Sequence, residues 1–256
     1  MSANLQFSTR KISLNTWLAR IGLAIALICA LAMIFSGFGY QLGLWHFRTG
    51  FAIIKWSFFG ALGAVVISLL GLVNPKAWNA HTVLVGMLGI AIGLGVAYVP
   101  WSWKQTLDAL PYIHDISTDV VNPPEFVATR ALRKEGENPA DYAGPEVAQQ
   151  QMDAYPDLVP MVTDVPAVEV FEHAKAAIEN MGLELIDADP QAGRIEATHT
   201  SFFYGFKDDM VVRIVPVPEG TRVDVRSKSR VGRSDLGQNA KRIREFLEEL
   251  DAELAG

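Results

Sequence analysis

Residues 21–45 read IGLAIALICALAMIFSGFGYQLGLW and contain no charged side chain. A helix of this length crosses a hydrocarbon layer of about 30 Å. Two more apolar stretches follow, which argues against a cleaved secretion signal and predicts three transmembrane helices, at about residues 18–42, 54–73 and 82–101. Tryptophan and tyrosine lie near the ends of these spans, where their rings suit the headgroup layer: Trp17, Tyr40, Trp45, Trp56, Trp78, Tyr98, Trp101 and Trp103.

The formal charge changes sign after the third span. Residues 1–103 contain six basic residues and no acidic residue, whereas the remainder holds 16 Lys and Arg and all 28 Asp and Glu, a charge of −12. We therefore expect a membrane domain at 1–103 and an acidic part outside the bilayer. Its partners would be the lipid bilayer and an anionic lipid or envelope protein, with no nucleic acid.

Basic residues near the span ends predict the orientation of the chain. One side carries four of them and the other side two: Arg10, Lys11, Arg20 and Lys76 against Arg48 and Lys104. This bias predicts a cytoplasmic N-terminus and, after three crossings, a C-terminal domain in the periplasm. The protein would then be an integral protein of a bacterial inner membrane.

Beyond the spans, residues 104–160 are interrupted by prolines and predict an extended connection, of which 127–149 is the most loop-like part. Residues 161–256 predict a soluble α+β domain. One amphipathic helix begins near Asp164 and ends at Gly182, and a second begins at Ser234 or Asp235. Between them we expect four strands, at 183–187, 194–200, 210–217 and 222–227. The expected fold is α-β-β-β-β-α, a four-stranded antiparallel sheet with two helices on one face.

The faces of the last hairpin predict its register. Pairing Pro216 with Thr221 places Ile214 opposite Val223 on the apolar face and Arg213 opposite Asp224 on the polar face. The helices would cover the apolar face. The polar face would be open to water or to a partner and would show Glu196, Thr198, Arg213, Arg222, Asp224 and Arg226.

Four separated phrases give the soluble part a family resemblance. They are PYIHDISTD at 111–119 with NPP at 122–124, AYPD at 154–157, GRIEAT at 193–198, and RVDVRSKSRVGRSDLG at 222–237. In this order they resemble the family known as domain of unknown function 1499, over about residues 105–252. Members often carry apolar helices ahead of the domain, and Tyr112 stands where they commonly have proline. The resemblance implies no activity, cofactor or assigned site.

The run that leaves the last strand and opens the last helix is a candidate anion site. Free backbone N–H groups and the helix dipole favour an anion there. The candidate residues are Arg226, Ser227, Ser229, Arg230, Arg233 and Ser234. In the alternative reading, Asp235 is itself the anion that caps the helix, and the arginines pair with nearby acids.

His114, Asp115 and Asp119 form an alternative site, because a carboxylate beside an imidazole can serve as acid, base or metal ligand. Their spacing matches no metal or triad signature, so they can equally form a turn that docks the segment on the domain. The aromatic residues from Phe202 to Phe206 either cap the core or touch a bilayer or partner.

These patterns favour a membrane-anchored envelope protein with a non-catalytic binding or scaffold domain for a lipid, a cell-wall component or a protein partner. No phosphate loop, dinucleotide fingerprint or zinc spacing is present in the sequence, and we expect no cofactor and no metal. The alternative is a hydrolase or metal-dependent enzyme that uses His114 with Asp115 or Asp119.

Overall fold

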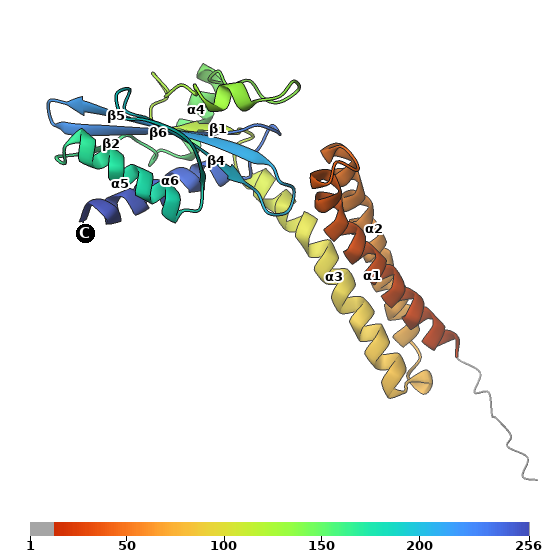
Figure 1. Ribbon diagram of the computed structural model, residues 1–256. Coiled ribbons are helices and arrows are strands. Elements are labelled where there is room, and N and C mark those ends of the chain that lie inside the picture. Colours follow the sequence, from red (N-terminus) through yellow and green to blue (C-terminus); the bar gives the residue numbers. More distant parts are fainter. Residues whose placement is uncertain (1–12, 256) are drawn as a thin grey trace, which may run out of the picture. The chain divides into compact units, whose positions relative to one another are not determined.

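The computed structural model describes residues 13–255. The chain divides into two compact units at the boundary between Lys104 and Gln105 (Figure 1). Arg10 and Lys11, which contribute to the predicted orientation, lie outside the described residues.

The first unit consists of three helices that are long and apolar enough to cross a membrane, as the sequence predicts. They are α1 (Leu14–Gln41), α2 (Phe47–Leu72) and α3 (Ala80–Ala109), with the short η1 (Pro75–Ala77) between the last two. Glycine allows α1 and α2 to approach closely, because a Cβ on Gly71 would lie 2.7 Å from the backbone nitrogen of Ala19. Their outward faces carry exposed leucine, isoleucine and phenylalanine side chains, which suit a hydrocarbon environment.

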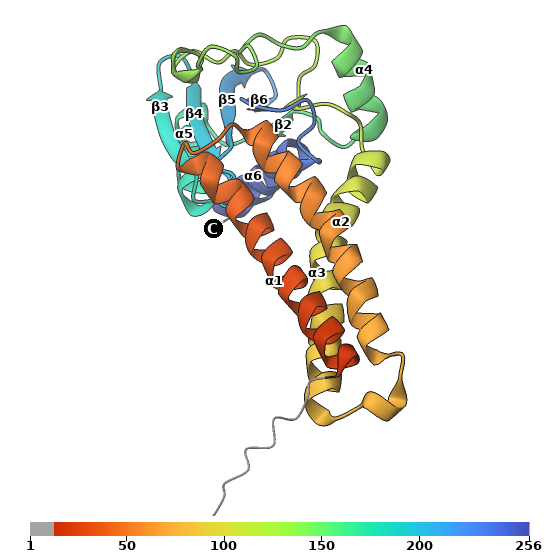
Figure 2. The ribbon, with the colours of Figure 1, turned by 90° about the vertical axis from the view of Figure 1, so that its right-hand side faces the viewer.

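The second unit contains an antiparallel sheet that has six strands among the described residues, with the order β1-β6-β5-β4-β3 and with β2 also on β6 (Figure 2). The strands are β1 (Asp115–Ser117), β2 (Met161–Thr163), β3 (Glu184–Asp189), β4 (Arg194–Thr200), β5 (Lys207–Val217) and β6 (Gly220–Ser229). The antiparallel sheet is confirmed, but the predicted number of four strands is wrong. The two additional strands have three residues each, too few to show an alternating pattern, and both obtain their hydrogen bonds from β6.

The predicted register of the last hairpin is confirmed. Pro216 pairs with Thr221, Ile214 with Val223 and Arg213 with Asp224. The apolar face of this hairpin packs against α5 (Ala167–Asn180) and α6 (Gln238–Ala255), which share one side of the sheet (Figure 1). Burial of their apolar stripes against the strands forms the core of the unit.

The opposite face of the sheet is covered by residues 118–143, here called the strap (Figure 2). It contains η2 (Thr129–Leu132) and leads into α4 (Pro145–Ala154), so residues 104–160 are more than the extended connection expected from the sequence. The expectation of an open polar face is also wrong, because Glu196, Asp224 and Arg226 are at most 2% exposed. Polar side chains on this face bind the strap in place of water.

Candidate functional site: two ion-pair clusters beneath the strap

Asp115 is the centre of the first ion-pair cluster. It is the first residue of β1 and pairs with Lys228 in the sheet register. Its carboxylate accepts hydrogen bonds from Nε and Nη2 of Arg226 at 2.8 and 3.0 Å, and it lies 2.9 Å from Nζ of Lys228. All three side chains are at most 2% exposed. The backbone N–H of Ala143, at the end of the strap, donates to the same carboxylate at 3.1 Å.

Asp209 is the centre of the second cluster and lies on β5, two strands away from Asp115 on β1. Arg230 donates to it in a fork, with Nη2 at 2.7 Å and Nε at 3.0 Å from the carboxylate. Nη2 of Arg133, from the strap, lies 2.8 Å from Oδ2 of the same carboxylate, and the Thr198 hydroxyl donates to Oδ1 at 2.9 Å. A fork between arginine and a carboxylate fixes the relative geometry of both planes, so the strap is held in one position.

The two clusters contain four cations and two carboxylates, and backbone carbonyls of the strap accept further hydrogen bonds from the cations. Arg226 donates to Pro124 O at 3.1 Å and to Ala140 O at 2.9 Å. Lys228 donates to Asp141 O, and Arg133 donates to Asn138 O at 2.8 Å. Burial lowers the pKa of Lys228, as do the nearby charges of Arg226 and Arg133, while Asp115 opposes this shift.

Aromatic rings complete the surroundings of Arg226. Its guanidinium lies 4.8 Å from the ring centre of Phe126 and 5.2 Å from that of Tyr142, both of which belong to the strap. Arg133 approaches the Phe126 ring at 5.4 Å. Such contacts favour a desolvated guanidinium. Burial raises the pKa of Tyr142 to about 12, and the negative charge of Asp115 adds to this effect.

Glu196 binds the start of the short helix η2 in the strap. Its carboxylate accepts from the backbone N–H groups of Val127 at 2.8 Å, Ala128 at 3.0 Å and Thr129 at 2.9 Å, and from the Thr129 hydroxyl at 2.7 Å. Side chains of β1, β4, β5 and β6 therefore hold the strap. The arrangement is suited to fixing a segment on a sheet.

His114, Asp115 and Asp119 point to different partners. His114 Nδ1 lies 3.3 Å from Arg233 O, and burial together with the Lys228 charge lowers the pKa of this imidazole. Asp119 accepts from Nη2 of Arg222 at 2.7 Å and from Nη2 of Arg213 at 3.2 Å. The structure does not bring the three together around one reacting position. These contacts instead dock the segment on the rest of the domain.

The six residues of the candidate anion site lie in three places. Strand alternation directs Arg226 and Arg230 beneath the strap, but directs Ser227 and Ser229 to the other face, where both bond to Asn239 of α6. Arg233 is exposed in the loop that follows. Anion binding by these six residues stays a prediction. Of their three arginines, Arg233 is the exposed one.

Asp235 and Ser234 bind the backbone at the start of α6. The Asp235 carboxylate accepts from Gly237 N at 2.9 Å and from Asn239 N at 2.8 Å, and Ser234 Oγ accepts from Leu236 N at 3.3 Å. Burial raises the pKa of Asp235, although its bonds to the backbone N–H groups act in the opposite direction. The geometry matches the alternative in which Asp235 is the capping anion.

Residues 115–250 match the family described as Protein of unknown function (DUF1499). The chain belongs to the DUF1499 family. The match begins at Asp115, the centre of the first cluster, and therefore includes the strap as well as the sheet and helices. No curated protein matches the chain.

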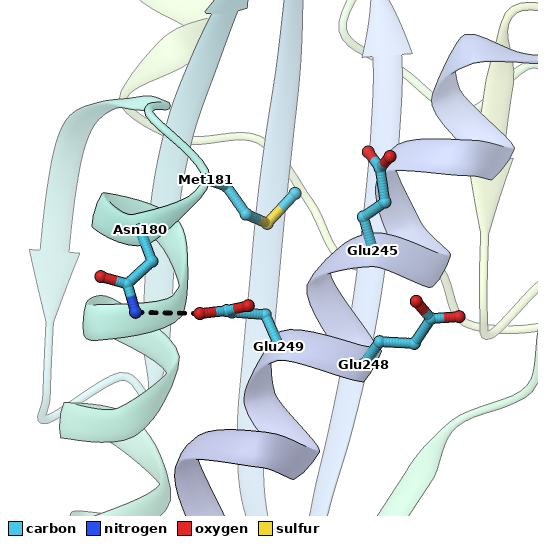
Figure 3. A pocket seen from close by; sticks show the side chains of 5 residues that line it. All are labelled: Asn180, Met181, Glu245, Glu248 and Glu249. Carbon is cyan, nitrogen blue, oxygen red and sulfur yellow. Dashed lines mark hydrogen bonds between the residues drawn. The ribbon is translucent and has the colours of Figure 1, made fainter.

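Two of the hollows on the surface of the DUF1499 domain lie against the strap and against the helices. One, of about 310 Å³, lies between the strap at Asn122–Val127 and the sheet residues Arg194, Val211 and Arg213. The other, of about 440 Å³, lies against α5 and α6, where Asn180 donates to Glu249 at 2.9 Å (Figure 3). Within residues 13–255, no group of three His, Cys, Asp or Glu side chains is arranged to hold a metal ion.

Sequence reasoning missed Asp209, Lys228 and Arg133 as members of the clusters in the DUF1499 domain. The signal for the strand residues is their position, since Asp209 and Lys228 alternate with residues that face the core. Charges at such places are expected to find partners when a segment covers them. Nothing in the local sequence around Arg133 indicates that it returns to this sheet.

Proposed function

We propose that this DUF1499 protein is a membrane-anchored, non-catalytic binding or scaffold module for a lipid, a cell-wall component or a protein partner. Its three helices anchor it in a bacterial inner membrane, with the N-terminus in the cytoplasm and the DUF1499 domain in the periplasm. The placement of Arg20 and Lys76 supports this orientation.

The proposal rests on one observation: the candidate catalytic groups already have partners within the domain. Asp115 and Asp119 are bound by arginines that hold the strap, and His114 faces a backbone carbonyl. An enzyme needs such groups to converge where a substrate atom can reach them. These residues stabilise the architecture of the domain, which supports a binding role over hydrolysis.

The hollow beside the strap is the candidate for ligand contact. Its volume of about 310 Å³ lies at the lower end of the range for small-molecule sites, about 300–1,000 Å³. Pro123, Pro124 and Val127 of the strap line the hollow, together with Arg194 and Arg213 of the sheet. Apolar and donor groups together suit a headgroup, a glycan or a short extended peptide.

Photo-crosslinking tests this proposal in cells that express the full chain. Val127 lines the hollow and Val162 lies outside it, yet their exposures are nearly equal at 51% and 54%. With benzoylphenylalanine at each position in turn, we expect a discrete adduct from position 127 only. Mass analysis then shows whether it is lipid, glycan or protein. Equal labelling at both positions, or none at either, contradicts a ligand at this hollow.

A further inference from the structure

Several segments of the DUF1499 domain meet at one end of its sheet. Thr200 of β4 pairs with Lys207 of β5, and the Arg230 N–H, just after β6, donates to Lys207 O at 2.9 Å. The Ser229 N–H donates to His114 O at 3.0 Å. The loop 201–206, the loop 230–236 and the residues before β1 therefore lie at the same end.

The polypeptide enters the domain at this end. Leu110, which follows α3 directly, packs against the core, and a Cβ on Gly237 would lie 2.9 Å from its Cδ1. The Asp235 N–H donates to Ile113 O at 3.3 Å. The opposite end of the sheet holds the hairpin turn at Gly220. It also holds the start of α5, because Thr221 donates to Val165 O, just before that helix, at 2.7 Å.

The end at which the polypeptide enters carries exposed aromatic and basic side chains. Phe202, in the loop 201–206, is 85% exposed, and Tyr112, just before β1, is 61% exposed. Arg233 is exposed in the neighbouring loop. Exposed aromatic and basic side chains at one end of a domain are typical of surfaces that contact lipid headgroups.

The connection to the last span is short. Helix α3 runs without interruption to Ala109, and Trp103 is expected at headgroup depth. At about 1.5 Å per helical residue, the six residues from Trp103 to Ala109 rise about 9 Å. Neighbouring strands are about 4.8 Å apart, so the start of β5 lies about 10 Å from β1, two strands away. Both lengths are within the thickness of a headgroup layer and its adjoining water.

We infer that this end of the DUF1499 domain, with Phe202 foremost, inserts into the headgroup layer of the bilayer that holds the three helices. The inference rests on the anchoring put forward under the proposed function. Burial of a phenylalanine side chain favours the inserted state by roughly 10- to 100-fold. The tether adds to this, because it keeps the loop at a high effective concentration near the lipid.

The charge of the domain selects which end is inserted. Residues from 104 onward carry −12, so most of the domain surface is repelled by anionic lipid. Arg233 places a positive charge at the same end of the sheet as Phe202, whereas the start of α5 carries Glu169 and Glu172. Val168, at the start of α5, is 81% exposed and provides an apolar residue of matched exposure at the other end.

Spin labelling of the full chain tests the inference. Cys29 is the single cysteine, so Cys29→Ala combined with Phe202→Cys or with Val168→Cys gives one nitroxide each. The proteins are reconstituted in vesicles of phosphatidylcholine and phosphatidylglycerol and washed at alkaline pH. Collision with oxygen and with a water-soluble nickel chelate then reports depth. We expect the label at 202 to be shielded from nickel and open to oxygen, and the label at 168 to be open to nickel.

A second label separates the role of the Phe202 side chain from that of the tether. It is attached through Arg233→Cys, with Phe202 retained or replaced by Phe202→Ser. We expect the serine variant to raise nickel accessibility at 233 by about tenfold, in line with the loss of one buried ring. Equal accessibility in both proteins contradicts a contribution from Phe202.

Each remaining outcome has a distinct meaning. Release from the vesicles by the alkaline wash overturns the anchoring, and the inference with it. Retention with nickel-accessible labels at both 202 and 168 overturns the inference and leaves the anchoring intact. A label at 202 that is shielded from nickel and oxygen alike indicates burial against protein, which also overturns insertion into lipid.

Discussion

We expect Asp115→Asn to lower the free energy of unfolding of the DUF1499 domain strongly, while the domain can still adopt its fold. The substitution keeps the size of the side chain but removes the charge that compensates Arg226 and Lys228, both 2% exposed. Loss of one partner from a buried ion pair costs about 3–5 kcal/mol, because the other charges stay buried. For a unit of this size the change corresponds to a decrease in Tm of roughly 6–20 °C.

The distribution of tryptophan makes the assay selective. Every tryptophan precedes residue 104, so tryptophan fluorescence reports the membrane unit and near-UV circular dichroism from tyrosine reports largely on the domain. In detergent, we expect Asp115→Asn to shift the second signal alone. Asp141→Asn is the control, since its pair with Arg130 is exposed and should contribute nothing measurable.

A double variant tests the cause of the destabilisation. Adding Lys228→Met to Asp115→Asn removes one of the two uncompensated cations, so the double variant should be more stable than the sum of the single effects predicts. If Asp115→Asn melts at the temperature of the parent, or if the two effects simply add, the ion-pair cluster does not hold the strap as described.

Three further predictions concern pH, the strap and topology. Burial lowers the pKa of His114, so on acidification the unfolded chain takes up this proton before the folded chain does. The free energy of unfolding therefore decreases as the pH falls below about 6.5. Urea titrations at about pH 7 and about pH 5 should show a smaller decrease for His114→Asn than for the parent. Deletion of residues 130–147 removes Arg133 and the carbonyls bound by Arg226 and Lys228, so cooperative unfolding should be lost, whereas a simple surface loop would tolerate it. A reporter fused after Gly256 should be active only if it functions outside the cytoplasm, and cytoplasmic activity would reverse the orientation.

The parts of the fold that were predictable are those encoded locally. The hairpin of β5 and β6 has one apolar and one polar face. The alternation of Val212, Ile214, Val223 and Val225 therefore indicates its register. The spans follow from length and composition alone. Both signals are contained within a few tens of residues.

The unpredicted parts depend on partners far away in the sequence. Arg226 and Asp115 are 111 residues apart, and the Glu196 carboxylate binds backbone groups 67 to 69 residues before it. Local periodicity carries no information on such pairs. The sequence does not show that the strap covers the sheet. The charges on β4, β5 and β6 therefore indicate a solvated face, and Arg226 and Arg230 indicate an anion site.

The two sides of the sheet also bear on how copies of the protein behave when a bilayer confines them to two dimensions. One side of β6 is occupied by two three-residue strands, which offer little length for pairing with another molecule. At the other side, β3 carries Glu184, Asp187 and Asp189 and has an irregular register next to Leu185. Two such strands brought edge to edge would place carboxylates against carboxylates. Both edges of the sheet therefore disfavour strand pairing between neighbouring copies.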